Sequence, residues 1–231
     1  MSYSNEAFRD RQAAGRLLAQ GLKHLSGKGV VVLGIPRGGI VVAAQISRLL
    51  KAQCDIVLAR KLGAPGNPEL AIGSVSEKGK LFLNKDLARR VGADENYIEA
   101  EKARQLAEIK NRAQRFRQIK EKVSLKGKIV IVTDDGVATG STMQAALWAS
   151  RQEKPRKLIA AVPIGAKESV EPLANYADEV IVLRVPDSLG AIGQFYADFE
   201  QISEEEAAKI LKEAVKGKEA PDEKRIAQEG S

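Results

Sequence analysis

The feature that most constrains the fold is a segment in which an apolar run is followed by two acids, a glycine and the start of a helix. Residues 129–133 read Ile-Val-Ile-Val-Thr, and consecutive aliphatic residues are typical of a strand buried on both faces of a parallel sheet. Asp134 and Asp135 come directly after this strand, and residues 143–150 continue as a helix. The segment therefore predicts an α/β fold with a mainly parallel twisted sheet flanked by helices.

The acids and the hydroxyls of this segment predict a ligand site. In open α/β sheets, ligands bind at the carboxyl ends of the strands, where Asp134 and Asp135 stand. Two neighbouring carboxylates can accept hydrogen bonds from ribose hydroxyls, or can hold a magnesium ion directly or through water. Residues 139–142 then offer backbone N–H groups and hydroxyls at a helix start, which attracts phosphate. A plain helix cap is the simpler interpretation, but capping needs one hydroxyl and no acidic pair.

The run Asp-Asp-Gly-Val-Ala-Thr-Gly-Ser-Thr resembles the motif that binds 5-phosphoribosyl 1-diphosphate (PRPP) in type I phosphoribosyltransferases. The resemblance extends over about residues 29–200. It implies that the acidic pair binds the ribose hydroxyls and that the following loop holds the 5-phosphate. The PRPP-binding residues that it implies are Gly38, Gly39, Asp134, Asp135, Gly136, Ala138, Thr139, Gly140, Ser141 and Thr142.

A second loop, Gly-Ile-Pro-Arg-Gly-Gly at 34–39, also follows an apolar strand (29–33) and opens a helix (40–50). Its glycines let backbone N–H groups approach an anion closely, although glycines in such a turn can also serve the turn alone. The loop resembles the family's pyrophosphate loop, which often carries an unusual cis peptide bond. Arg37 adds a positive charge to it.

Arg60 and Lys61 follow a strand expected at 55–59 and open a segment, 60–68, whose Gly and Pro content predicts a loop. A solvated strand end is the simpler interpretation of this cationic pair. The pair resembles the Arg-Lys that adenine-type members place on the leaving pyrophosphate. The resemblance then implies that Mg²⁺ and the cations stabilise the charge of the departing group. The implied catalytic residues are Arg37, Arg60, Lys61, Asp134 and Asp135.

Residues 186–200 resemble the hood that covers the base in hypoxanthine-guanine enzymes, to which the N-terminus is also expected to contribute. By that resemblance Leu189 occupies the base-stacking position, while Asp198 joins Asp134 and Asp135 as a metal contact. Phe195 and Tyr196 offer an alternative aromatic face for the base, or pack the hood onto the core. These are the expected base-binding and metal-binding residues.

The acceptor is left open by two departures from the family pattern. Ala138 stands where hypoxanthine-guanine enzymes carry an aspartate base, and residues 162–164 (Val-Pro-Ile) lack the lysine that reads a 6-oxo group. We expect a Mg²⁺-dependent transfer from PRPP to a nitrogenous base, with a purine slightly favoured. The alternative is a non-catalytic protein that senses PRPP or nucleotides and regulates a partner.

Alternating patterns organise the remainder of the chain. We expect a first helix over 6–25, short strands over 71–77 and 80–83, further strands over 157–162 and 179–185, and a last helix over 202–215. A long charged helix over 94–122 has a narrow apolar stripe, and its other face is a solvated surface, a movable cover or a dimer contact. The predicted organisation is one domain over 1–215, with an insertion at 78–124 and a flexible tail at 216–231.

Composition limits the classes of ligand and partner that we expect. The net charge of +7 suits an anionic small substrate, and aromatic residues make up only 4%, which disfavours base-stacking surfaces for nucleic acid. Cys54 is the only cysteine and His24 the only histidine, so a disulfide or a histidine-based triad is excluded within this chain. The sequence has no apolar run long enough to predict a membrane span, and no pattern that predicts a signal peptide. We therefore expect a cytoplasmic protein, and a homodimer as in the family.

Overall fold

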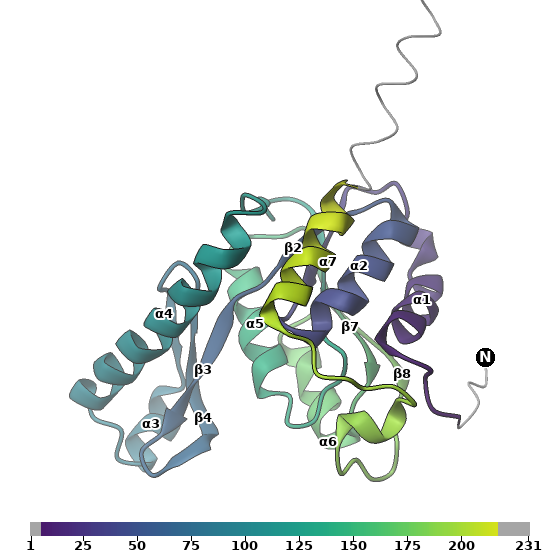
Figure 1. Ribbon diagram of the computed structural model, residues 1–231. Helices are drawn as coiled ribbons and strands as arrows, with labels where there is room; N and C mark the ends of the chain where they lie inside the picture. Colours follow the sequence, from purple (N-terminus) through teal and green to yellow (C-terminus); the bar gives the residue numbers. More distant parts are fainter. Residues whose placement is uncertain (1–5, 217–231) are drawn as a thin grey trace, which may run out of the picture.

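The computed structural model describes residues 6–216, and its centre is a five-stranded parallel sheet in the order β2-β1-β6-β7-β8 (Figure 1). This confirms the predicted α/β class. The strands are β1 (Val30–Gly34), β2 (Gln53–Ile56), β6 (Ile129–Thr133), β7 (Lys157–Ile164) and β8 (Glu179–Arg184).

Helices cover both faces of this sheet, which explains the uninterrupted aliphatic runs of β1 and β6. Val32 and Ile131 pack in one core with residues of α1 (Arg11–Gly21), α2 (Gly38–Leu50) and α7 (Glu204–Lys216). Val31 and Val130 point to the other face, where they pack with α5 (Ser141–Arg151) and the short α6 (Lys167–Val170). Alternate side chains of each strand therefore enter different cores. The 3₁₀ turns are η1 (Lys23–Leu25), η2 (Glu171–Asn175) and η3 (Ile192–Phe195).

A second, antiparallel sheet forms a lobe beside the parallel sheet (Figure 1). It contains β3 (Ala59–Ala64), β4 (Asn67–Ser76) and β5 (Leu81–Leu83), with helices α3 (Lys85–Arg90) and α4 (Glu95–Arg117). The prediction of a loop over 60–68 is wrong. Glycine and proline make the turn only at residues 65–66, where Gly66 has φ +71°, while the residues before it pair with β4. The predicted turn at 78–79 is confirmed, with Gly79 at φ +74°.

The helix boundaries follow from capping. The first helix begins at Arg11 instead of residue 6, because Asp10 accepts a 2.6 Å hydrogen bond from the Ala13 N–H and is itself extended. Asp94 caps α4 in the same way, so the helix begins at Glu95. The helix ends at Arg117, five residues earlier than predicted, and the chain then returns to the edge of β2. Lys216 ends α7, and the rest of the predicted tail, 217–231, lies outside the described residues.

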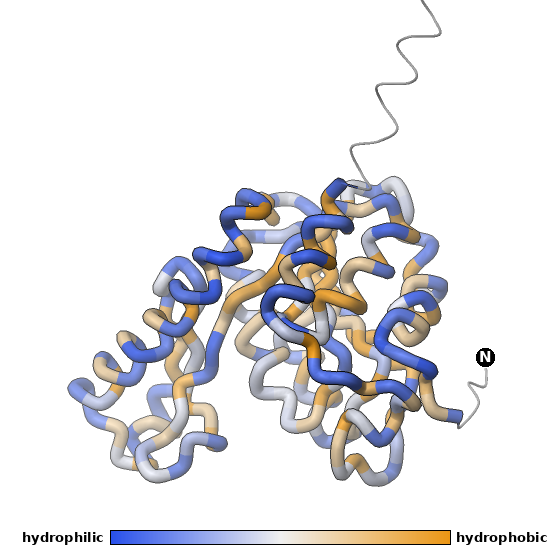
Figure 2. The backbone as a smooth tube through the Cα atoms, viewed as in Figure 1, coloured by the Kyte–Doolittle hydropathy of each residue, from blue (hydrophilic) through white to orange (hydrophobic). Residues whose placement is uncertain are grey.

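Hydropathy follows this arrangement. In Figure 2 the central strands are the most hydrophobic part of the tube, and α4 is mostly hydrophilic along its length. Within residues 6–216, no helix is both long enough and apolar enough to cross a membrane.

Candidate functional site

The glycine loop after β1 and the acidic turn after β6 lie side by side because their strands are neighbours in the sheet. The Ile35 N–H donates to the Thr133 carbonyl at 3.0 Å. A Cβ atom on Gly39 would lie 2.8 Å from the same carbonyl oxygen and 2.9 Å from the Asp134 Cα, so only glycine allows this approach. The peptide bond between Pro36 and Arg37 is cis, as the family resemblance implied.

The two carboxyl groups of the acidic pair are partly buried and close to each other. The Asp135 N–H donates to Asp134 Oδ1 at 2.9 Å. Burial, followed by the neighbouring Asp135 carboxylate, raises the pKa of Asp134 well above its usual range. A cation or a set of hydrogen-bond donors at this turn would therefore be favoured, because it would offset the crowding of the two carboxyl groups.

Arg11, which the sequence analysis missed, supplies such a cation. Its Nε lies 2.7 Å from Asp135 Oδ2, and its Nη1 donates to the Glu200 carbonyl at 2.8 Å. The guanidinium also stacks 3.7 Å from the centre of the Phe199 ring. The side chain is mostly buried although it stands in the first turn of α1, where the helix dipole disfavours a cation.

The loop expected to hold phosphate lies at the start of α5. Gly140 is its N-cap with φ +78°, and the Thr139 and Ser141 hydroxyls lie 3.2 Å apart. The Ser169 hydroxyl donates to the Ala138 carbonyl and fixes the loop from behind. The first backbone N–H groups of an 11-residue helix have no partner within the helix, so they remain available to an anion.

Two adjoining cavities open on these loops. The larger, of 470 Å³, is lined by Arg11, Pro36, Arg37, Gly38, Arg112, Asp135, Phe199, Gln201 and Ile202. The other, of 420 Å³, is lined mainly by β3, α4 and the 57–59 segment, and it includes Arg60, Lys61, Arg104 and Thr142. Pro36 and Arg112 line both, so the two cavities are neighbours beside the glycine loop. Together their linings include the predicted cations, Gly38, Asp135 of the acidic pair and Thr142 at the helix start, whereas Asp134 lines neither cavity.

The long helix α4 forms a wall of the second cavity. Arg60 Nε on β3 donates to Gln105 Oε1, and Gln105 Nε2 donates to Glu101 Oε1 at 2.8 Å. Hydrogen bonds from Arg104 lower the pKa of Glu101. Glu101 and Gln105 are buried because they continue the inward face of the helix, two turns and one turn before the stripe residue Ile109. Most of the opposite face is exposed, in agreement with the interpretation of that face as a solvated surface. Lys61 Nζ lies 2.9 Å from Glu69 on the same rim.

The hood residues lie differently from the expectation. Tyr196 is buried, its hydroxyl donates to the Asp135 carbonyl at 2.6 Å, and its ring packs 5.4 Å from Phe8. The packing interpretation therefore describes Tyr196, and the base-stacking one is wrong for it. Leu189 and Phe195 pack against the same cluster and line neither cavity. The aromatic ring that does face the larger cavity is Phe199.

Asp198 is not gathered with the acidic pair. Its carboxylate is exposed and accepts a 3.2 Å hydrogen bond from the Glu200 N–H, while its own backbone N–H donates to the Arg9 carbonyl at 2.9 Å. These two contacts tie the residue to the hood backbone and to the N-terminal segment. Across residues 6–216 no group of three or more His, Cys, Asp or Glu side chains is placed to hold a metal ion. The expected metal contacts Asp134, Asp135 and Asp198 therefore do not form a protein cage.

Comparison with known proteins gives consistent relatives. A family model described as the phosphoribosyl transferase domain matches residues 4–200. A Mycobacterium tuberculosis protein, provisionally named a phosphoribosyl transferase, is 44% identical over 207 residues, which are 90% of this chain and 47% of that protein. The chain thus spans about half the length of this relative.

Two further proteins are similar. The crystal structure of TT1426 from Thermus thermophilus has 46% identity and a TM-score of 0.83, covering 90% of this chain and 98% of that one. A ribose-phosphate pyrophosphokinase from Sulfurisphaera tokodaii is 36% identical over 83 residues, or 36% of this chain and 26% of that protein. By its domain match and these relatives, the chain belongs to the phosphoribosyl transferase domain family.

Proposed function

We propose that this chain transfers the 5-phosphoribosyl group from PRPP to a nitrogenous base and releases pyrophosphate. One observation carries the proposal: the glycine loop at 36–39 and the acidic pair meet at adjacent strand ends, beside cavities that are rich in arginine. PRPP is a ribose with a phosphate at one end and a pyrophosphate at the other. The start of α5, the acidic pair and the glycine loop offer a matching site for each of these three parts, in that order.

In this proposal each part of PRPP has a matching element. The 5-phosphate binds the backbone N–H groups and hydroxyls of 138–142 at the start of α5. The ribose hydroxyls donate to Asp134 and Asp135. The pyrophosphate lies on the 36–39 loop, with Arg37 beside it and Arg60 and Lys61 across the adjoining cavity.

The chemical step forms a bond between the base nitrogen and the anomeric carbon, while the bond from that carbon to the pyrophosphate oxygen breaks. Negative charge grows on the departing pyrophosphate, and positive charge grows on the sugar. Cations that touch the leaving group stabilise the transition state more than the bound substrate, which raises the rate. Arg37, Arg60 and Lys61 are the residues proposed for this, and the acidic carboxylates face the developing positive sugar.

The donor set fits a magnesium ion that arrives with its substrate. Mg²⁺ is commonly bound through one or two carboxylates together with substrate phosphates, and Asp134 and Asp135 offer those carboxylates. When bound, Mg²⁺ would neutralise charge on the pyrophosphate. Arg11 holds Asp135 through its Oδ2 at the rim of the larger cavity, so the chain's own role is to position this carboxylate beside the substrate.

The acceptor enters through the larger cavity, where Phe199 and Ile202 offer apolar contact and Gln201 offers an amide. These groups suit a flat nitrogen heterocycle. A purine remains our favoured class from the hood resemblance.

The test is an acceptor screen. The purified chain is incubated with PRPP, Mg²⁺ and a panel of purine, pyrimidine and related nitrogen bases, and pyrophosphate release is measured. With at least one base, pyrophosphate should be released, and the release should require PRPP. Tight PRPP binding with no release across the panel would contradict the enzyme and favour the alternative, a non-catalytic PRPP or nucleotide sensor.

A further inference from the structure

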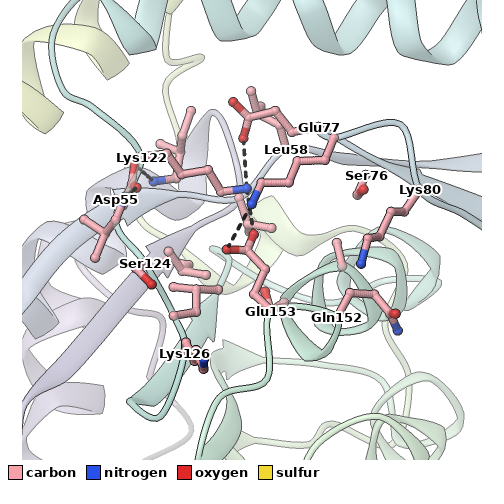
Figure 3. Close-up of a pocket in the computed structure, with 18 residues that line it drawn as sticks. Asp55, Leu58, Ser76, Glu77, Lys80, Lys122, Ser124, Lys126, Gln152 and Glu153 are labelled. Atoms are coloured by element: carbon pink, nitrogen blue, oxygen red, sulfur yellow. Dashed lines mark hydrogen bonds and ion pairs between the residues drawn. The ribbon is translucent and has the colours of Figure 1, made fainter.

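A third cavity lies on the other side of the 57–58 segment from the catalytic cavities, and the proposed reaction does not use it. It measures 270 Å³ and lies between the edge of β2, the end of α5, the turn after β4 and the return segment after α4 (Figure 3). Its apolar lining comprises Leu33, Ile56, Val57, Leu58, Val123, Leu125 and Ala149. A concave apolar floor with a few polar groups is the usual form of a small-molecule site.

The acids of this cavity are already neutralised. Asp55 lies 2.7 Å from Arg117, and Glu77 lies 2.9 Å from the same guanidinium. Glu153 lies 2.7 Å from Lys122, which also reaches Glu77 at 3.4 Å. Figure 3 shows Lys122 between these two carboxylates. Lys78 adds a longer contact to Glu153, at 3.9 Å, so each of the three acids has a cation and the acids leave no negative charge unmatched.

Two lysines remain beyond this balance. Lys80 and Lys126 line the cavity, and within residues 6–216 neither has a carboxylate at ion-pair distance. Figure 3 shows both apart from the chain of ion pairs around Lys122. The hydroxyls of Ser76 and Ser124 and the amide of Gln152 also line the space, and in the described part of the chain their side chains make no hydrogen bond. The unused groups are therefore two positive charges and several donors.

We propose that this cavity binds a phosphomonoester with a flat organic body, such as a nucleoside monophosphate. A phosphomonoester carries close to two negative charges at neutral pH, which matches the two surplus lysines. Its oxygens accept from ammonium and hydroxyl donors, and such charge-assisted hydrogen bonds are the strong ones. The organic body covers the apolar floor around Leu58 and Val123.

Occupancy of this site would reach the catalytic cavity through a shared wall. Val57 and Leu58 line both spaces, and Arg60 and Lys61 follow closely along the chain. The Leu58 carbonyl accepts a 3.1 Å hydrogen bond from the Glu77 N–H. Glu77 belongs to the polar lining of the third cavity, so this lining is connected to the shared wall. We therefore expect the ligand to change the affinity for PRPP, and this expectation rests on the proposed function. Binding of the ligand to the third cavity does not depend on the proposed function.

The experiment measures AMP binding by calorimetry, with inorganic phosphate as the comparison. The variants are Lys80→Gln with Lys126→Gln and a charge-matched control, Lys23→Gln with Lys28→Gln, which lies outside the three cavities. Thermal unfolding checks that both variants fold. A third variant, Asp134→Asn with Asp135→Asn, separates this site from the PRPP site.

One AMP should bind to the wild type and to the asparagine variant, with affinity at least about tenfold weaker in the Lys80 and Lys126 variant and unchanged in the control. Hydrogen exchange should slow at 76–80 and 122–126. Absence of AMP binding, equal binding in both lysine variants, or loss of AMP binding in the asparagine variant would overturn the site. Equal affinity for inorganic phosphate would overturn the assigned organic body. These results are independent of the acceptor screen, so the site and the reaction can fail separately.

Discussion

Replacing Arg11 by alanine should destabilise the protein through the acidic pair. The side chains of Arg11 and Asp135 are 10% and 17% exposed, so their contact is largely removed from water. Breaking a buried ion pair by deleting one partner costs about 3–5 kcal/mol, and the residual exposure of Asp135 places this case at about 3 kcal/mol. For a chain of this size that loss lowers Tm by about 6–12 °C.

A double-mutant cycle isolates the ion pair from the other contacts of Arg11. The cycle uses Arg11→Ala, Asp135→Asn and both together, followed by chemical denaturation. Once Asp135 is neutral, removal of Arg11 should cost only its stacking on Phe199 and its hydrogen bond to Glu200, about 1 kcal/mol. The expected coupling is therefore about 2 kcal/mol.

The exposed Arg16→Ala on the same helix is the control and should be close to neutral. Coupling below about 0.5 kcal/mol would refute the reasoning, because distant and independent sites already add to within that margin. It would mean that Arg11 acts by packing alone and that the charge of the acidic pair is balanced elsewhere.

Three further outcomes are expected. Lys61→Ala should lower the turnover rate about 10²-fold with a smaller change in PRPP affinity, measured by steady-state kinetics and calorimetry; equal losses in both would assign Lys61 to ground-state binding. Gly39→Ala should cost about 2 kcal/mol, since its Cβ would lie 2.8 Å from the Thr133 oxygen, whereas Gly21→Ala, with nothing within 4 Å, is the control; equal melting temperatures would contradict the steric argument. Burial alone would raise the pKa of Glu77, but hydrogen bonds and charge from Arg117 lower it below the usual 4.5. Its stabilisation is therefore present above that value and lost as pH falls through the lowered pKa, so the stability gap between wild type and Glu77→Gln in urea should close at low pH, and a constant gap would count against it.

Much of the fold was predictable because the strands of the parallel sheet are buried on both faces. The run at 129–132 is entirely aliphatic, so its pattern is unambiguous, and most of β7 is buried in the same way. The edge strand β8 is only partly buried. The antiparallel lobe was harder. Residues 60–64 carry two cations and a glycine, and their pairing with β4 is a tertiary choice that composition does not reveal.

The residues of the candidate site also differ in how far the sequence predicted them. The glycine loop and the acidic turn each lie within one short segment, so local spacing predicted them. Arg11 lies 124 positions from Asp135 and carries no motif, and Gln105 is a polar residue on the inward face of α4 whose partner Arg60 comes from a distant strand. The position of Asp198, and the choice between the two interpretations of Tyr196, could not be predicted because the conformation of the hood depends on its contacts with the N-terminal segment, including Phe8. Long-range partners of this kind leave little trace in a single sequence.

The central claim is that Asp134 and Asp135 bind the ribose of PRPP beside the glycine loop. Titration calorimetry of PRPP with Mg²⁺ into wild type and into Asp134→Asn with Asp135→Asn tests it directly, with unfolding curves to confirm that the variant is folded. We predict binding by the wild type and no measurable binding by the variant, because the amides cannot offer the same pair of charged acceptors. Unchanged PRPP affinity in the folded variant would contradict the account.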